Sequence, residues 1–206
     1  MADSNGFVVV WPQGTFSLAG YSNSNPSWNA GRCCGPAANT NRGANIDDVG
    51  FLRTLVTTTR STYDTTIDPS RVYFAGHSNG CMMAQRMAVA ASDLVAAVGC
   101  HSGWLMTGST GSATPSAPTG YVPRSVMVVT GLSDRVVPYA QSNYWPGGLH
   151  NMQMWATLNS CPSSSSVVVT TISTYTRRER QPCGGGSSVA MIELPGIGHY
   201  PFLGQE

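Results

Sequence analysis

The stretch from Val72 to Ala91 constrains the fold of this chain more than any other. It opens with a short apolar run, Val72 to Ala75, which is typical of a buried strand. It then turns through Gly76-His-Ser-Asn-Gly80 and continues into an Ala- and Met-rich run that predicts a helix over 81–91. In this order of strand, turn and helix, the central serine stands on a sharp turn, clear of the backbone, where it can attack a carbonyl.

Ser78 is therefore predicted to be the nucleophile of an α/β-hydrolase-type site. We expect glycine at positions 76 and 80 because strand and helix pass close together there. The start of the helix would place the backbone N–H of Asn79 near the developing oxyanion. The alternative is a chance G-x-S-x-G in a chain with 23 glycines, and the flanking strand and helix argue against it.

A serine nucleophile needs a base and a group that orients the base, and in a parallel sheet both lie at the carboxyl ends of strands. The segment Gly131–Asp134 directly follows an apolar run over 125–130, and the segment Gly196–His199 follows another over 189–194. The chain order Ser, Asp, His is that of α/β-hydrolases, so Ser78, Asp134 and His199 are the predicted triad. Asp134 could instead be a plain turn former. The less well placed rivals are Asp47, Asp48, Asp64, Asp68, Asp93, His77, His101 and His150.

Of these rivals, we expect His77 to be structural because its backbone is committed inside the turn, and His101 is a candidate to line the pocket because it follows a predicted strand end.

Strands and helices alternate along the chain, which predicts one domain over residues 1–206 with a mainly parallel sheet and helices on both faces. The expected fold is an α/β-hydrolase-type three-layer sandwich. Apolar runs predict strands over 6–11, 72–75, 94–100, 125–130, 167–174 and 189–194, and helical patterns begin at Asn45, Cys81 and Met152. Asn45 is the expected N-cap of the first helix.

The charge of the chain is low and nearly balanced, with 11 basic residues, 10 acidic residues and a net charge of +1. No basic stripe indicates a nucleic-acid partner, and no stretch approaches a membrane span. All the basic residues are Arg, which excludes a Schiff base on a lysine. No Cys/His spacing fits a zinc site, and a serine esterase needs no cofactor.

Six cysteines in a Ser-, Thr- and Gly-rich chain predict an oxidising, extracellular setting. The chain opens on polar residues, so a leader was removed, never existed or lies upstream. Sequence alone leaves the pairing of Cys33, Cys34, Cys81 and Cys100 open, and the last two could be buried thiols. A thiol enzyme using Cys81 or Cys34 would lack a positioned base.

Segments spread over nearly the whole chain resemble one known family. They are Gly6–Gly14, Trp28-Asn29 with Gly31 and Cys33–Gly35, Asp47–Leu52, Asp68–Tyr73, Ser78–Gly80, Gly131 with Asp134, Val137–Tyr139, Trp155 with Cys161, Cys183, and Gly198-His199 with Pro201. Together they resemble the esterases that include poly(3-hydroxybutyrate) depolymerases and feruloyl or acetylxylan esterases. The resemblance implies an extracellular serine esterase with the triad given above. It also implies a Cys161–Cys183 disulfide that helps to hold the His199 loop.

The chain departs from the family pattern in three ways. Cys81 replaces a small residue that is often Gly, and Tyr200 replaces the usual Trp after the histidine. The earlier strands and the His-Gly loop, which normally supplies a second oxyanion N–H, are missing ahead of strand 6–11. We therefore expect a sheet shortened at the N-terminus, with strand 6–11 beside strand 71–75 and Gln13 as a candidate oxyanion donor. Completion of the sheet by a partner chain or an upstream segment is the alternative.

The substrate is predicted to be a small-molecule or polymeric ester. Trp28, Trp104, Tyr139 and Tyr200 lie in loops that could line a cleft for an aromatic acyl group or a polyester chain, or could merely cover the core. The predicted reaction is hydrolysis of feruloyl or acetyl-type esters, or of a polyester such as polyhydroxyalkanoate, through an acyl-enzyme. The alternative is a truncated or degenerate hydrolase fold that acts as a binding or scaffold protein. An open sheet edge would also favour pairing into a homodimer.

Overall fold

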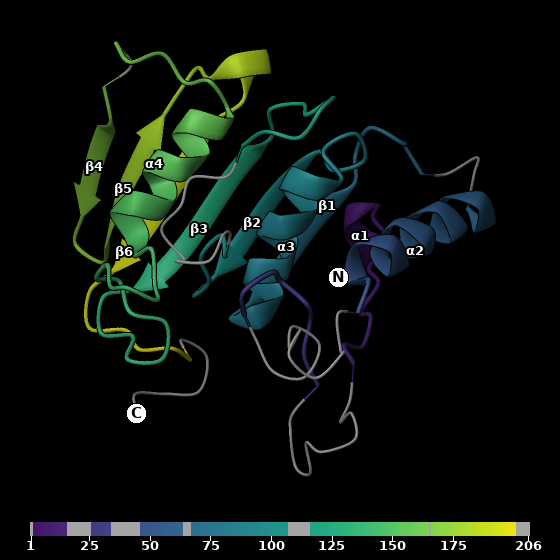
Figure 1. Ribbon diagram of the computed structural model, residues 1–206, viewed down its shortest axis with the longest axis horizontal. Helices are drawn as coiled ribbons and strands as arrows, with labels where there is room; N and C mark the ends of the chain where they lie inside the picture. The colour runs from purple at the N-terminus through teal and green to yellow at the C-terminus, as the bar shows by residue number, and fades with distance from the viewer. Residues whose placement is uncertain are drawn as a thin grey trace.

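A six-stranded sheet in the order β1-β2-β3-β6-β5-β4 forms the centre of the computed structural model (Figure 1). The structure describes residues 2–15, 26–33, 46–63, 67–106, 116–164 and 166–200. The strands β1, β2, β3 and β6 are parallel, and β5 and β4 add an antiparallel edge. This confirms the predicted, mainly parallel α/β architecture. The strands are β1 (Tyr73–His77), β2 (Ala97–His101), β3 (Ser125–Gly131), β4 (Val168–Ile172), β5 (Tyr175–Arg180) and β6 (Val189–Leu194).

Two helices cover one face of the sheet (Figure 1). The helix α3 (Asn79–Ala90) packs on β1 and β2, and α4 (Gly148–Leu158) packs on β6. The helix α2 (Asp48–Thr62) contacts α3, and the short elements are α1 (Ala2–Asn5) and the 3₁₀ helix η3 (Gly184–Gly186). None of the helices described is both long and apolar enough to cross a membrane.

The core lies between these helices and the sheet. Val98, Cys100, Val126 and Val128 are buried, whereas their sequence neighbours are less so, and the Met127 side chain is 39% exposed. This alternation shows that β2 and β3 bury mainly one face, although continuous apolar runs are typical of strands that bury both.

The predicted strand over residues 6–11 is wrong. Residues 7–14 have no regular secondary structure, and β1 lies at the edge of the described sheet, where it pairs with β2. The side chains from Phe7 to Trp11 are between 37% and 87% exposed. An apolar run forms a strand only where a neighbour provides ladder hydrogen bonds, and β1 does not provide them here. The segment is held at its end instead, where Thr15 and Ser27 exchange two backbone hydrogen bonds of 2.9 and 3.1 Å.

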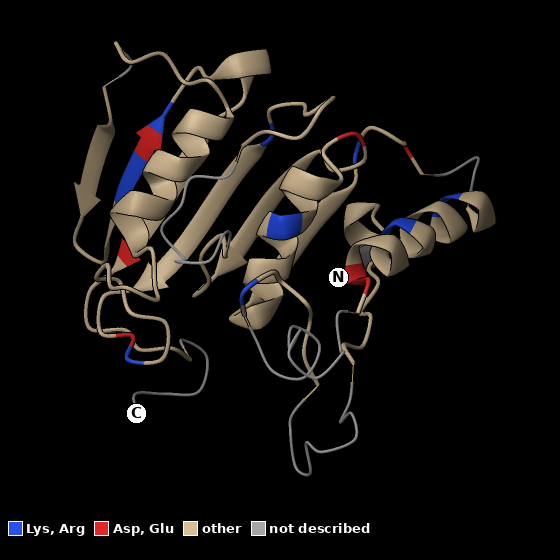
Figure 2. Ribbon diagram, in the orientation of Figure 1, with Lys and Arg blue, Asp and Glu red and all other residues tan. Residues whose placement is uncertain are grey.

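Strand β5 has no counterpart among the predicted strands because its sequence, Tyr-Thr-Arg-Arg-Glu-Arg, is dominated by charge. Ion pairs allow this segment to lie in the sheet. Arg178 contacts Glu193 of β6 at 2.7 Å, and Arg177 contacts Glu179 at 2.7 Å. Figure 2 shows basic and acidic residues side by side along β5. A charge-rich segment can therefore form a strand when its neighbour carries the opposite charge.

The N-cap of α2 is Asp47, whose side chain accepts a hydrogen bond from the Gly50 backbone N–H at 2.9 Å. The sequence instead predicts the cap at Asn45, which lies outside the described residues, as do Cys34, Asp64 and Pro201.

Two disulfides between described residues fix helices α3 and α4 to neighbouring parts of the fold. Cys161 and Cys183 are bonded, with their Cα atoms 4.0 Å apart, which ties the end of α4 to the segment before β6. Cys81 and Cys100 are bonded with a Cα separation of 5.0 Å, which ties α3 to β2. Cys81 therefore has no thiolate to offer, and the thiol-enzyme reading of this residue is wrong.

Candidate active site

The turn between β1 and α3 projects Ser78 from the end of the sheet. Ser78 has φ 55° and ψ −122°, a strained conformation for a residue with a side chain, and it is the N-cap of α3. A Cβ at Gly76 would lie 2.4 Å from the carbonyl carbon of Gly80, so glycine is required at position 76. The expectation for Gly80 itself is wrong, since a Cβ there would meet no described atom within 4 Å. Its backbone, rather than its missing side chain, makes the close approach.

Ser78, His199 and Asp134 lie together in hydrogen-bonding contact. His199 Nδ1 is 2.8 Å from Asp134 Oδ2, and His199 Nε2 is 2.9 Å from Ser78 Oγ. A carboxylate only accepts hydrogen bonds, so Nδ1–H donates to Asp134. This leaves Nε2 as the acceptor for the Ser78 hydroxyl. The Asp134 and His199 residues are only 5% and 4% exposed, so their interaction is shielded from water.

A backbone hydrogen bond connects the loop after β3 with the loop after β6. The Ser133 N–H donates to the Ile197 carbonyl at 3.0 Å, and a Cβ on Gly131 would lie 2.1 Å from that same oxygen. Asp134 Oδ1 accepts hydrogen bonds from the backbone N–H groups of Val136 and Val137, both at 2.8 Å. The carboxylate is thus fixed by its own loop before it contacts His199.

Asn79 is the first residue of α3, so its backbone N–H has no acceptor within the helix and lies next to Ser78. This is the position that oxyanion stabilisation requires of a donor. Gln13 is exposed, and among the described residues its loop connects with the turn through the Thr15–Ser27 pairing and then Trp28.

The Asn79 side chain both accepts a hydrogen bond from the backbone of Trp28 and donates one to it. Asn79 Oδ1 accepts from the Trp28 N–H at 2.6 Å, and Asn79 Nδ2 donates to the Trp28 carbonyl at 3.1 Å. The Trp28 ring stacks on Phe51 of α2, with the ring centroids 6.3 Å apart. Trp28, although distant in the sequence, is thereby held against Asn79, the residue that directly follows the predicted nucleophile.

A buried network that sequence reasoning missed holds the next residue, Asn29. Its N–H donates to Asp48 Oδ2 at 2.6 Å, and its carbonyl accepts from Arg86. Burial raises the pKa of Asp48, and the hydrogen bond from Asn29 and the charge of Arg86 oppose that shift. The acidic pair Asp47-Asp48 is visible in the sequence, but it predicts only the first turn of a helix and not a contact with Asn29.

The other aromatic candidates have different surroundings. The prediction that Trp104 binds substrate is wrong, because Trp104 is fully buried and its indole N–H donates to the Pro138 carbonyl at 3.1 Å. The Tyr139 hydroxyl is occupied by Glu193 Oε1 at 2.5 Å. Tyr200 is 41% exposed, and its ring centroid is 4.9 Å from that of His199.

His101 lies at the end of β2 beside the triad. Burial lowers the pKa of His101 to about 4, with the charge of His77 acting in the same direction and Asp134 opposing it. The imidazole is therefore neutral at neutral pH and adds no positive charge beside His199.

The pKa of His101 leads to a prediction for stability. Between about pH 6.5 and about pH 4, the unfolded chain binds a proton at this position that the folded chain does not. Stability is therefore full above about pH 6.5 and falls as the pH drops towards 4. His101→Asn should flatten this part of the profile, as measured by urea unfolding at a series of pH values. Equal slopes for the variant and the parent would contradict the assignment.

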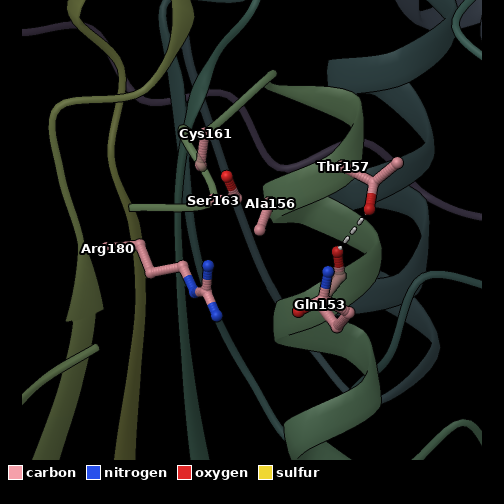
Figure 3. Close-up of a pocket in the computed structure, with 6 residues that line it drawn as sticks. All are labelled: Gln153, Ala156, Thr157, Cys161, Ser163 and Arg180. Atoms are coloured by element: carbon pink, nitrogen blue, oxygen red, sulfur yellow. Dashed lines mark hydrogen bonds between the residues drawn. The ribbon is translucent and has the colours of Figure 1, made fainter. Parts of the chain in front are cut away.

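A separate pocket of about 290 Å³ lies between α4 and β5, away from the triad (Figure 3). Arg180 extends from β5 towards α4, where Thr157 Oγ1 donates to the Gln153 carbonyl at 3.1 Å. The residues that line this pocket are Gln153, Ala156, Thr157, Cys161, Ser163 and Arg180, and none of them belongs to the triad. No group of three or more His, Cys, Asp or Glu in the described part of the chain could hold a metal ion.

The parallel sheet with its Ser78 turn, and the Asp134 and His199 loops at neighbouring strand ends, define an α/β-hydrolase. Residues 9–176 match the family described as phospholipase/carboxylesterase, and the chain belongs to that family. Among solved structures, it is similar to an acetyl xylan esterase from Aspergillus awamori, with 21% identity and a TM-score of 0.55. The similarity covers 76% of this chain and 64% of that one, and it supports the fold alone. No curated protein sequence matches the chain.

Proposed function

We propose that this protein hydrolyses carboxylic esters through an acyl-enzyme on Ser78. The observation that carries the proposal is the pair of hydrogen bonds that links Ser78 Oγ, His199 and Asp134 at 2.9 and 2.8 Å. In the described structure, this is the arrangement in which a weak nucleophile gains an adjacent base and the base gains an orienting group. Membership of the phospholipase/carboxylesterase family supports the same reaction class.

In the proposed reaction, His199 Nε2 takes the proton of Ser78 as Oγ attacks the ester carbonyl. Asp134 keeps the remaining proton on Nδ1 and stabilises the charged imidazolium. His199 then gives its proton to the leaving alcohol, and water releases the acyl group by the reverse sequence of transfers. The Asn79 N–H is the proposed first oxyanion donor, and a backbone N–H near Gln13 is the proposed second. One such donor contributes about 2.7–4 kcal/mol to the transition state.

The direct test is to mix the purified chain with p-nitrophenyl acetate, stop the reaction in acid and map the acetyl group by peptide mass spectrometry. We expect p-nitrophenol release and an acetyl group on Ser78. Acetylation at another residue, or turnover without any trapped acyl-enzyme on Ser78, would contradict the mechanism. The absence of turnover would favour the binding or scaffold alternative.

For the substrate, we propose acetyl or feruloyl-type esters, with polyesters such as polyhydroxyalkanoate as a second class. The positions of Trp28 and Tyr200 support an apolar or aromatic acyl group. Trp28 is fixed to Asn79 next to the nucleophile, and Tyr200 lies beside His199. Aromatic side chains provide large, rigid contact areas for such groups. The disulfides Cys81–Cys100 and Cys161–Cys183 support the proposal of an extracellular setting.

We predict that Trp28→Ala lowers kcat/KM for a feruloyl ester about ten-fold more than for an acetyl ester, because only the larger acyl group loses an apolar contact. The ratio of the two kcat/KM values is the measurement, since a general loss of folded protein cancels in it. Trp11→Ala is the matched control because that side chain is 87% exposed. An unchanged ratio in Trp28→Ala would remove Trp28 from the proposed acyl site.

A further inference from the structure

His77, the last residue of β1, contacts the backbone of the residue proposed as the catalytic base. Its Nε2 lies 2.7 Å from the carbonyl oxygen of His199. A carbonyl oxygen can only accept, so Nε2 of His77 bears the proton and donates it. The residue directly before the nucleophile is therefore hydrogen-bonded to a residue that follows it by more than a hundred positions.

The ring of His77 is packed from several sides. Its centroid is 4.7 Å from that of His199, 5.4 Å from that of Tyr200 and 5.5 Å from that of His101. The His101 ring is stacked on it at an interplanar angle of 27°, and the low pKa of His101 keeps that neighbour uncharged at neutral pH. These contacts limit the rotation of the His77 ring and aim its Nε2–H at the His199 carbonyl.

The backbone before His199 needs such a hold. Gly196 has φ 73°, and Gly198 also lacks a side chain that could pack, so the two glycines leave the loop few side-chain anchors. Ser133 fixes the loop at the Ile197 carbonyl, two residues before His199. The bond from His77 fixes it at His199 itself, on the same residue whose ring must reach both Ser78 and Asp134.

We propose that His77 is a positioning residue, which sets the distance between His199 Nε2 and Ser78 Oγ by holding the His199 carbonyl. His77 then holds both Ser78 and His199, because it is covalently joined to Ser78 and hydrogen-bonded to His199. The proposal rests on the proposed serine-esterase function. A misplacement of about 1 Å in such a pair can reduce the rate about a hundred-fold without changing substrate binding.

The test compares His77→Phe, which keeps an aromatic ring and removes the donor, with His77→Gln, whose amide N–H reaches a similar position. The measurements are kcat and KM with p-nitrophenyl acetate, and the rate of labelling by a fluorophosphonate. For His77→Phe we expect kcat and the labelling rate to fall about 10- to 100-fold, with KM within about two-fold of the parent. His77→Gln should restore most of both rates.

Labelling of His77→Phe at the parent rate would overturn the proposal, as would equal losses in the two variants, because the donor would then be irrelevant. Should His77→Phe fail to fold, His77→Gln alone decides, and a ten-fold or greater loss in the folded Gln variant would overturn the proposal. A parent protein that is not labelled on Ser78 would instead contradict the proposed function, so the two failures are distinguishable.

Discussion

Replacing Ser78 with alanine is expected to lower kcat for p-nitrophenyl acetate by about 10⁴- to 10⁶-fold, because no other described group occupies the position of the nucleophile. The fold should be retained. Among the described residues, the Ser78 side chain hydrogen-bonds only to His199, and the backbone bonds of the turn, such as Ser78 N–H to the His101 carbonyl at 2.9 Å, are unaffected. Thermal unfolding should therefore shift by no more than about 2 °C.

The matched control is Ser163→Ala, in the pocket between α4 and β5. It should leave kcat unchanged, because that pocket contains no triad residue. Activity that persists in Ser78→Ala but falls in Ser163→Ala would move the active site from the strand ends to the α4–β5 pocket.

Asp134→Asn should lower kcat about 10⁴-fold while leaving the geometry of the loop nearly intact. The Asn oxygen can still accept from the Val136 and Val137 N–H groups, as Asp134 Oδ1 does now at 2.8 Å. Its amide nitrogen would then face His199 Nδ1 and donate to it. This favours the tautomer that carries its proton on Nε2, which cannot accept the proton of Ser78. Steady-state kinetics with p-nitrophenyl acetate measure the loss.

Asp93→Asn is the control for this second change. Asp93 pairs with Arg53 at the surface, and its side chain is 63% exposed, so kcat should stay at the parent value. Equal activity in Asp134→Asn and Asp93→Asn would show that Asp134 does not orient the base.

The triad could be predicted because the positions of its three residues depend on local sequence patterns. Ser78, Asp134 and His199 each lie at or in the loop after an apolar run, and each run forms a strand of the parallel part of the sheet. Parallel strands bring their carboxyl ends to one edge, so three positions far apart in the chain converge. The chain order then assigned the roles.

The misplaced and missed elements depend on partners that a local pattern does not reveal. The run from Phe7 to Trp11 has the composition of a strand but pairs with none of the described strands, and the charges of β5 are balanced from β6 by Glu193. The contact of Asn79 with Trp28 spans 51 residues and uses backbone groups of Trp28, which any residue except proline could provide. Trp104 is buried by the folded core around it rather than by its own loop sequence.

His199 and Asp134 are proposed to activate Ser78. The most direct measurement is intact-protein and peptide mass spectrometry after treatment with a fluorophosphonate, because this reagent reacts with activated serines. We expect one adduct per chain, located on Ser78 and absent from Ser78→Ala. A parent protein that stays unlabelled, or an adduct on any other residue, would contradict it.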